Sequence, residues 1–248
     1  MAADAYDRFM GRYSRLLAPQ LADLAGVRAG QRVLDVGCGP GALTAELVAR
    51  LGPAAVAAVD PSGPFVTAVR ERHPGVDVRL APAERLPFPD RGFDAALAQL
   101  VVHFMSEPVG GLAEMARVTR RGGVVAACVW DHAGRQGPLG LFWQAARDLD
   151  PDVTDESQLA GVRAGHLSAL FEAAGLHDIQ EATLVATLKH ASFEEWWEPL
   201  GGAVGPAGSY VAGLDTARRA ELRERCRALL PTAPFVVVAR AWATRGLA

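Results

Sequence analysis

The sequence predicts an α/β fold: a Rossmann-like, doubly wound sheet that is mostly parallel, in a single domain spanning 1–248. Three observations predict it. Short apolar runs alternate with stretches of helix-forming composition, which is typical of a parallel sheet with crossover helices. A glycine-rich turn at 37–41 joins the first run to the first of these helices. Half of the residues are hydrophobic, which is enough for a large core.

The elements follow in order along the chain. Apolar residues at helical spacing predict a helical segment over 4–25, formed around Phe9, Leu16, Leu17, Leu21 and Leu24. Apolar runs of strand length then predict strands at 32–36, 55–60, 77–81, 93–98 and 123–130. The stretches between them predict helices at 41–51, 63–72 and 108–119. Pro61 keeps the residue before it out of helical geometry, and Ser62 is placed to cap the helix that follows.

In the second half of the chain, strand-like and helix-like stretches alternate less regularly. Their pattern predicts helices at 138–148, 164–174 and 215–230, and strands at 177–189 and 235–242. Gly175 ends the second of these helices. We interpret 131–165 and 191–232 as a cover over a substrate cavity. Packing of these segments against the sheet edge or a partner subunit is an equal alternative.

The turn after the first strand carries the strongest functional signal. Gly37, Gly39 and Gly41 form a G-x-G-x-G loop, which lets backbone approach a ligand closely because no Cβ intrudes. Asp60 ends the second strand, nineteen residues after Gly41, where a carboxylate accepts hydrogen bonds from ribose hydroxyls. Each feature alone has a plain alternative, a tight connection or a strand-end turn residue. Together they predict a nucleotide-type site at the carboxyl ends of the strands.

Asp35 favours one class of ligand for this site. A dinucleotide site has G-x-G-x-x-G, whereas the sixth position here is Ala42. A carboxylate inside the preceding strand would repel a pyrophosphate but suit an ammonium or a sulfonium. The residues therefore favour an adenosine ligand that carries positive charge.

Five blocks resemble one family in the same order. They are Val33-Leu-Asp-Val-Gly-Cys-Gly-Pro-Gly-Ala-Leu-Thr44, Ala57-Ala-Val-Asp-Pro-Ser62, Ala81-Pro-Ala-Glu-Arg-Leu-Pro-Phe-Pro-Asp90, Phe93-Asp-Ala-Ala-Leu-Ala-Gln-Leu-Val-Val-His-Phe104 and Arg117-Val-Thr-Arg-Arg-Gly-Gly-Val-Val125. The blocks resemble the class I S-adenosylmethionine-dependent methyltransferases of the ubiquinone/menaquinone-biosynthesis type (methyltransferase type 11), which act on small molecules. The resemblance is strong over residues 5–130 and looser beyond. It implies seven strands, with the C-terminal strand inserted antiparallel between its neighbours.

The resemblance also implies a cofactor, S-adenosyl-L-methionine, and the residues that bind it. Gly37 and Gly39 would lie under its amino-acid and ribose parts, with Asp35 toward the ammonium and Asp60 on the ribose hydroxyls. Pro61 would lie beside the adenine, with Ala83 and Glu84 at the adenine nitrogens. Gln99 and Leu100 would offer carbonyls to the ammonium. Tyr13 would close over the methionine carboxylate. Glu84 as a solvated turn residue and Tyr13 as a packing residue are the alternatives.

Catalysis by this family implies in-line displacement of a methyl group, which depends on positioning and desolvation more than on a dedicated base. His103 is the candidate base, because it follows the fourth strand and histidine accepts protons near neutral pH. A structural role for His103 is the alternative. Five aromatic residues (Phe142, Trp143, Phe193, Trp196 and Trp197) would form either a cavity for a hydrophobic or aromatic acceptor or plain core.

The composition and the sequence pattern exclude several classes of protein and of binding site. A net charge of −3 gives no electrostatic footprint for nucleic acid, and no apolar run reaches the length of a membrane span. The three cysteines form no close pair, and no histidine spacing indicates a metal site, so we expect neither a disulfide framework nor a metal. With no secretion signal at the start, we expect a cytoplasmic bacterial enzyme, monomeric or homodimeric.

Three functional hypotheses remain open at this point. The first and favoured one is a methyltransferase that acts on a small molecule with an O, N or C acceptor atom. The second is a non-catalytic protein that binds the same cofactor or serves as a scaffold. The third is an NAD(P)-dependent oxidoreductase, against which Asp35 argues.

Overall fold

The computed structural model describes residues 3–202 and 205–248. Its sheet has seven strands in the order β3-β2-β1-β4-β5-β7-β6. The strands are β1 (Val33–Val36), β2 (Val56–Asp60), β3 (Asp77–Leu80), β4 (Phe93–Gln99), β5 (Thr119–Trp130), β6 (His177–His190) and β7 (Phe235–Leu247). The first five are parallel, and β7 lies antiparallel between β5 and β6. The predicted mixed sheet, including its inserted last strand, is confirmed.

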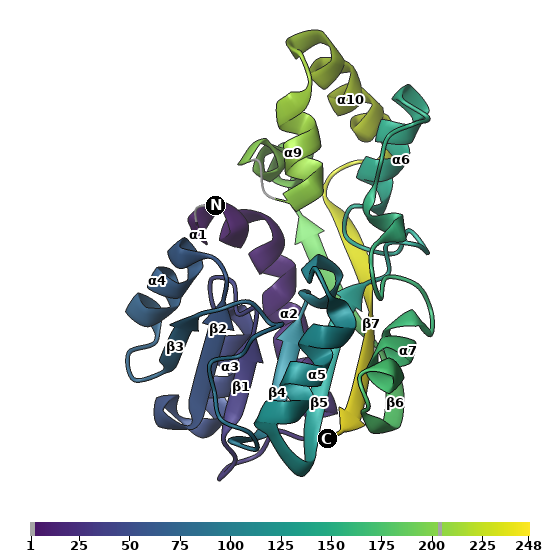
Figure 1. The fold of residues 1–248 in the computed structure, drawn as a ribbon. Coiled ribbons are helices and arrows are strands. Elements are labelled where there is room, and N and C mark those ends of the chain that lie inside the picture. The colour runs from purple at the N-terminus through teal and green to yellow at the C-terminus, as the bar shows by residue number, and fades with distance from the viewer. Residues whose placement is uncertain (1–2, 203–204) are drawn as a thin grey trace.

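Helices surround the sheet (Figure 1). The α-helices are α1 (Ala3–Tyr6), α2 (Arg12–Leu24), α3 (Ala42–Leu51), α4 (Gly63–Arg72), α5 (Pro108–Val118), α6 (Gly140–Leu149), α7 (His166–Ala173), α8 (Phe193–Trp197), α9 (Gly205–Gly213) and α10 (Thr216–Leu229). A π-helical turn, η1 (Asp7–Gly11), joins α1 to α2. Short 3₁₀ turns are η2 (Pro53–Ala55), η3 (Val102–Phe104), η4 (Glu156–Gln158) and η5 (Glu198–Gly202).

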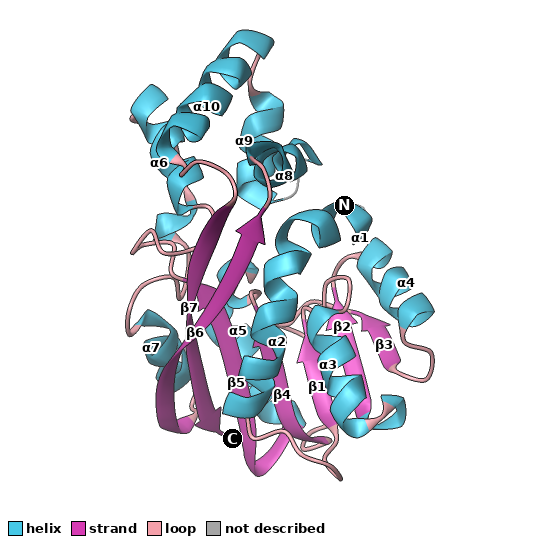
Figure 2. Cartoon of the chain, turned by 180° about the vertical axis from the view of Figure 1, so that it is seen from behind, coloured by secondary structure: helices cyan, strands magenta, loops and turns pink. Residues whose placement is uncertain are grey.

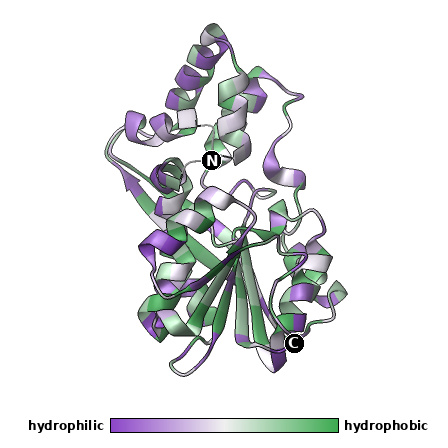
Figure 3. Cartoon of the chain, turned by 60° about the vertical axis from the view of Figure 1, so that its left-hand side comes forward, coloured by the Kyte–Doolittle hydropathy of each residue, from purple (hydrophilic) through white to green (hydrophobic). Residues whose placement is uncertain are grey.

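Alternate residues of the strands face two helical layers. Side chains such as Val33, Leu97 and Cys128 pack with α2 and α3, which Figure 2 shows in front of the sheet. Their neighbours Leu34 and Ala96 pack on the other face with α5 and α7. Because both faces are covered, the parallel strands are almost continuously apolar, as Figure 3 shows.

The strand order reverses between β1 and β4, since β2 follows β1 on one side and β5 follows β4 on the other. Val33 pairs with Val56 of β2 and with Ala95 of β4, so the loops after β1 and β4 leave the same edge of the sheet side by side. Such a switch point opens a crevice at the carboxyl ends of the strands. The fold therefore places the ligand site above β1 and β4.

The paired strands β6 and β7 reach beyond the other strands, and α6, α8, α9 and α10 gather at that end (Figures 1 and 2). These helices have a hydrophobic cluster of their own, which includes Phe142, Trp143 and Trp197. Phe9 of η1 belongs to the same cluster, so the N-terminal segment touches the cover.

Most predicted boundaries agree with the observed ones within about two residues, and two strands differ. β5 begins at Thr119 rather than 123, because Thr119 already pairs with Phe93 before a register shift to the Ala95–Val124 pair. β7 runs to Leu247 rather than 242, because it stays paired with both neighbours to that point. Within the described ranges, the helices are all too short or too polar to cross a membrane.

Candidate functional site

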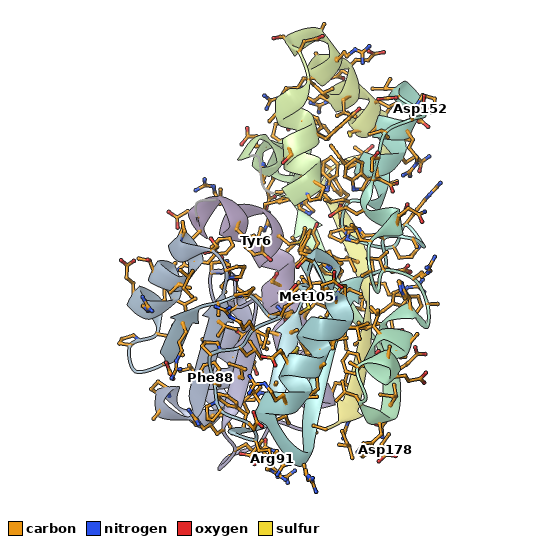
Figure 4. All side chains as sticks on the ribbon, viewed as in Figure 1. Tyr6, Phe88, Arg91, Met105, Asp152 and Asp178 are labelled. Carbon is orange, nitrogen blue, oxygen red and sulfur yellow. The ribbon has the colours of Figure 1, made fainter. Side chains whose placement is uncertain are left out.

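A cavity of about 510 Å³ lies at the carboxyl ends of the strands. This volume falls within the ~300–1,000 Å³ typical of small-molecule sites. Ten of the eleven residues predicted for the site line it: Asp35, Gly37, Gly39, Asp60, Pro61, Ala83, Glu84, Gln99, Leu100 and His103. They come from the ends of β1, β2 and β4 and from the segment after β3. Figure 4 labels two further lining residues, Tyr6 in the N-terminal helical segment and Met105 in the loop before α5.

The glycine loop is held in a conformation that side chains resist. Gly37, Gly39 and Gly41 have φ of +70°, +52° and +100°. The amide of Gly37 donates to the carbonyl of Val59 at 2.8 Å, which ties the loop to β2. A Cβ on Gly37 would lie 2.4 Å from a methyl of Val101 in the loop after β4. The absence of side chains here is therefore required by packing as well as by backbone geometry.

Asp60 connects the second strand to the glycine loop. Its carboxylate accepts a hydrogen bond from the amide of Gly39 at 2.8 Å and another from the amide of Ser62 at 2.8 Å. Asp60 is buried, and burial raises the pKa of its carboxyl group although both amides lower it. The side chain is thus fixed at the cavity wall before any ligand arrives.

Asp35 lies deeper, at the end of β1. One oxygen accepts a hydrogen bond from the Thr44 hydroxyl at 2.6 Å, and the other is buried without a partner. Burial raises the pKa of Asp35 to about 7, although the bond from Thr44 lowers it. A buried carboxylate with an unpaired oxygen is costly in isolation. A cationic group beside Asp35 would satisfy that oxygen and favour the ionised form.

The end of β4 offers further acceptors. Gln99 donates through Nε2 to the Ser14 carbonyl at 3.0 Å, which leaves its Oε1 buried and unpaired. Leu100 has φ of +61°, unusual for a residue with a branched side chain. Such strain clusters at functional sites. Its amide is anchored to the Cys128 carbonyl of β5 at 2.8 Å.

The carboxylate of Glu84 is hydrogen-bonded to other residues of the protein. One of its carboxylate oxygens accepts from the amide and hydroxyl of Ser106, both at 2.9 Å, and from the amide of Glu107 at 3.3 Å. Burial raises its pKa, but these hydrogen bonds together hold it below the usual value. Glu84 therefore joins the segment after β3 to the loop before α5 and is not a free solvated turn residue.

The position of Tyr13 differs from the predicted one. It is buried in the core beside Trp130 and does not line the cavity, and its hydroxyl lies 3.0 Å from His190 Nε2. One helical segment earlier, Tyr6 lines the cavity with its ring against Phe65 of α4, at 5.7 Å between centroids. The π-helical turn between them changes which residues of the N-terminal segment face the site.

The end of the cavity beyond His103 holds a buried polar cluster. The rings of His103 and His132 lie 5.8 Å apart, and His132 Nε2 lies 3.8 Å from Glu156 Oε1. The other Glu156 oxygen accepts from the indole of Trp143 at 2.8 Å. Burial, and then His132, lower the pKa of His103 to about 3. Burial also lowers the pKa of His132, against the opposing effect of Glu156.

The remaining wall near this cluster is apolar, with Phe9, Met10, Leu139, Pro206 and Ala207 among its residues. The five aromatic residues considered for the acceptor cavity do not line it. Phe142, Trp143, Phe193, Trp196 and Trp197 are buried in the core of the cover instead. Large aromatic rings are needed there because the cover must build its own core away from the sheet.

Sequence reasoning missed several lining residues. Glu156 has no pattern that marks it, since it lies in an irregular loop and reaches the site only through its contact with α6. Tyr6 lies in a helical segment next to the site. A correct helical register for that segment would have predicted that Tyr6 faces the cavity. Trp130 and His132 were not missed: Trp130 is the last residue of β5 and His132 follows it, so the rule that ligands meet the carboxyl ends of strands predicts both as lining residues, and both line the cavity.

Comparisons with known proteins agree with this geometry. A family model described as a methyltransferase domain matches residues 34–127. The chain is 30% identical over 197 residues to a malonyl-[acyl-carrier protein] O-methyltransferase of Erwinia billingiae, covering 67% of this chain and 77% of that protein. It is 40% identical over 115 residues to a demethylmenaquinone methyltransferase of Tropheryma whipplei, covering 45% of this chain and 47% of the relative.

A solved structure shares the fold. The YcgJ protein of Bacillus subtilis superposes with a TM-score of 0.59 at 20% sequence identity, covering 93% of this chain and 97% of that chain.

Proposed function

Because this chain belongs to the family of S-adenosylmethionine-dependent methyltransferases, we propose that it transfers a methyl group from S-adenosyl-L-methionine to a small-molecule acceptor. The observation that carries the proposal is the convergence of Asp35, Asp60 and the glycine loop on one cavity. His103, His132 and Glu156 line the same cavity, and in this proposal the acceptor binds beside them.

The residues fit the cofactor on two counts. The unpaired buried oxygens of Asp35 and Gln99 suit an ammonium group, which would donate hydrogen bonds to both. The loop at Gly39 leaves its backbone open to a ligand, since Gly39 lines the cavity and no atom lies within 4 Å of a Cβ placed on it. In this proposal Asp60 accepts from the ribose hydroxyls, with Gly37 and Gly39 beneath the amino-acid and ribose parts.

The adenine end is assigned to the segment after β3. We place Pro61 beside the adenine ring with Phe65, and Ala83 and Glu84 at the adenine nitrogens. Leu100 contributes its backbone near the ammonium, and Tyr6 takes over the covering role expected of Tyr13. All of these residues except Tyr13 line the cavity.

When bound, S-adenosyl-L-methionine supplies a methyl group on a positively charged sulfur, already activated for displacement. The chain's own contribution is positioning and exclusion of water. The fixed carboxylates hold the cofactor, and the apolar wall of Phe9, Met10 and Leu139 keeps water from the acceptor end. In this proposal the cofactor-binding core is 27–130, the segments 131–165 and 191–232 cover its substrate side, and 1–26 is a separate N-terminal helical segment.

The first test is calorimetric titration of the purified protein with S-adenosyl-L-methionine, S-adenosyl-L-homocysteine and NAD in separate runs. We expect saturable binding of the first two and none of NAD, because Asp35 disfavours a pyrophosphate. Binding of NAD alone would overturn the proposal in favour of an oxidoreductase. Binding of the two cofactor forms without transfer to any acceptor would favour a non-catalytic binding protein.

His103 has the position of the predicted base but a poor environment for one. A pKa near 3 keeps the imidazole neutral at pH 7 yet makes it a weak proton acceptor. We therefore expect His103→Ala to lower kcat by about tenfold or less, well short of the ~10²–10⁴ that a general base contributes. Steady-state kinetics with cofactor affinity measured in parallel tests this, and a loss of ~10³ with intact cofactor binding would restore the base role.

A further inference from the structure

The acceptor end of the cavity contains polar atoms that the protein itself leaves unpaired. His103 Nδ1, His132 Nε2 and Trp130 Nε1 are buried without a hydrogen-bond partner. All three side chains line the cavity. Trp130 and His132 flank the same glycine, since a Cβ placed on Gly137 would lie 3.4 Å from Trp130 Cβ and 3.4 Å from His132 Nδ1. Three unpaired buried atoms on side chains that line one cavity indicate that a ligand group pairs with them.

The charges around this end restrict the ligand. None of the described residues that line the cavity is a lysine or an arginine, whereas four are carboxylic acids: Asp35, Asp60, Glu84 and Glu156. The sulfonium of the cofactor would add one positive charge, which these groups outweigh. An acceptor carboxylate or phosphate would meet Glu156 without a cationic partner, and that arrangement is costly in a buried site.

Hydrogen-bond capacity narrows the choice further. The indole N–H of Trp130 only donates, and a neutral imidazole accepts at the ring nitrogen that carries no proton in its tautomer. A hydroxyl group can accept from the first and donate to the second. An ammonium group only donates and would leave the indole unpaired, whereas a carboxylate only accepts and would leave the imidazole nitrogen unpaired.

We propose that the acceptor is an uncharged apolar molecule with a hydroxyl group, bound at His103, His132 and Trp130, and that His132 takes the hydroxyl proton. This inference rests on the methyltransferase function proposed above. Glu156 is a positioning residue: it lies 3.8 Å from His132 and is itself held by Trp143 of α6. Its carboxylate stabilises the imidazolium that forms when the proton arrives.

The proposed reaction transfers the methyl group from sulfur to oxygen. The hydroxyl oxygen forms a bond to the methyl carbon while the carbon–sulfur bond of S-adenosyl-L-methionine breaks. The electron pair of that bond stays on sulfur, which becomes the neutral thioether of S-adenosyl-L-homocysteine. The hydroxyl proton moves to His132 and is later released to water, and the products are a methyl ether and S-adenosyl-L-homocysteine.

Three probes that share one apolar body test the acceptor class: 2-naphthol, 2-naphthoic acid and 2-(aminomethyl)naphthalene, which carry a hydroxyl, a carboxylate and an ammonium group at neutral pH. Each is titrated calorimetrically into protein saturated with S-adenosyl-L-homocysteine. We expect 2-naphthol to bind about 5- to 150-fold more tightly than the other two, the range that corresponds to one unpaired buried polar group. The proposal is overturned if 2-naphthol does not bind more tightly than both matched probes.

Glu156→Gln tests the charge argument, because glutamine keeps an acceptor for Trp143 but removes the negative charge. We expect the variant to bind 2-naphthoic acid more tightly, with its preference for 2-naphthol reduced or lost and its affinity for S-adenosyl-L-methionine unchanged. The matched control is Glu172→Gln on the exposed face of α7, which should keep the wild-type preference. An unchanged preference in Glu156→Gln would contradict the role given to Glu156.

Transfer of a labelled methyl group to 2-naphthol tests the base. His132→Gln should still bind 2-naphthol but transfer the label ~10²–10⁴-fold more slowly than the wild type. Wild-type protein that binds 2-naphthol without methylating it, or a His132→Gln variant with wild-type rates, would overturn the assignment of His132. Failure of S-adenosyl-L-methionine to bind would instead refute the proposed function, so the two failures are distinguishable.

Discussion

Asp60→Ala is expected to weaken S-adenosyl-L-methionine binding by about 1–3 kcal/mol, or roughly 5- to 150-fold in Kd. The proposed ribose hydroxyls would lose their acceptor in a site that excludes water. The amides of Gly39 and Ser62 would also lose the carboxylate that now accepts from both at 2.8 Å. The loop under the cofactor would therefore be less well fixed as well as less polar. Calorimetric titration of wild type and variant under identical conditions measures the change.

Two controls make this result interpretable. Asp152→Ala removes an exposed carboxylate from the loop after α6 and should leave the affinity unchanged. The unfolding midpoint of Asp60→Ala shows whether the variant is folded at the titration temperature. A folded Asp60→Ala with wild-type affinity would remove the ribose assignment, while the fold and the family membership would stand.

The part of the cavity that we propose for the cofactor could be assembled from the sequence, because its residues lie at the ends of consecutive strands. Asp35, Gly37 and Asp60 fall within 26 positions of one another, in a strand–loop–helix–strand unit whose geometry is nearly fixed by its local sequence. Parallel pairing of β1 with β2 then brings their carboxyl ends together, as Asp35 opposite Ala58 illustrates. A periodic pattern and a glycine turn are enough to place these residues.

The end of the cavity that we propose for the acceptor could not be assembled from the sequence, because its residues do not all come from the ends of consecutive strands. Glu156 reaches the cavity from an irregular loop, and its position depends on Trp143 of α6 rather than on any strand. The aromatic residues of the cover could equally have been cavity wall or core from their sequence alone. Which one they form depends on how α6, α8 and α10 pack together, and that packing carries no local signal.

Tyr13 shows a third reason why the sequence alone does not place every residue of the site. The helical segment was expected in the right place, but the site depends on which face of it turns toward the cavity. A π-helical turn at Asp7–Gly11 shifts that face by part of a turn, so that Tyr6 lines the cavity and Tyr13 packs on Trp130. Apolar periodicity alone does not report such a local change of helical pitch.

Gly37→Ala is expected to destabilise the protein by about 2–5 kcal/mol, combining ~1–2 kcal/mol for a left-handed backbone with ~1–3 kcal/mol for overpacking. The backbone contribution arises because Gly37 has φ of +70°. The packing contribution arises because the added Cβ would lie 2.4 Å from Val101. Denaturant unfolding at constant m-value measures the loss.

A matched pair of variants separates the two contributions. Gly39→Ala has φ of +52° and no atom within 4 Å of its new Cβ, so it should lose only the backbone part, about 1–2 kcal/mol. Gly37→Ala combined with Val101→Ala removes the two Val101 methyl groups at 2.4 and 2.5 Å and leaves only its Cβ at 3.0 Å, so the double variant should be about 1–3 kcal/mol more stable than the sum of the single changes predicts. Strict additivity would mean that Val101 does not press on the loop and that backbone conformation alone requires glycine at this position.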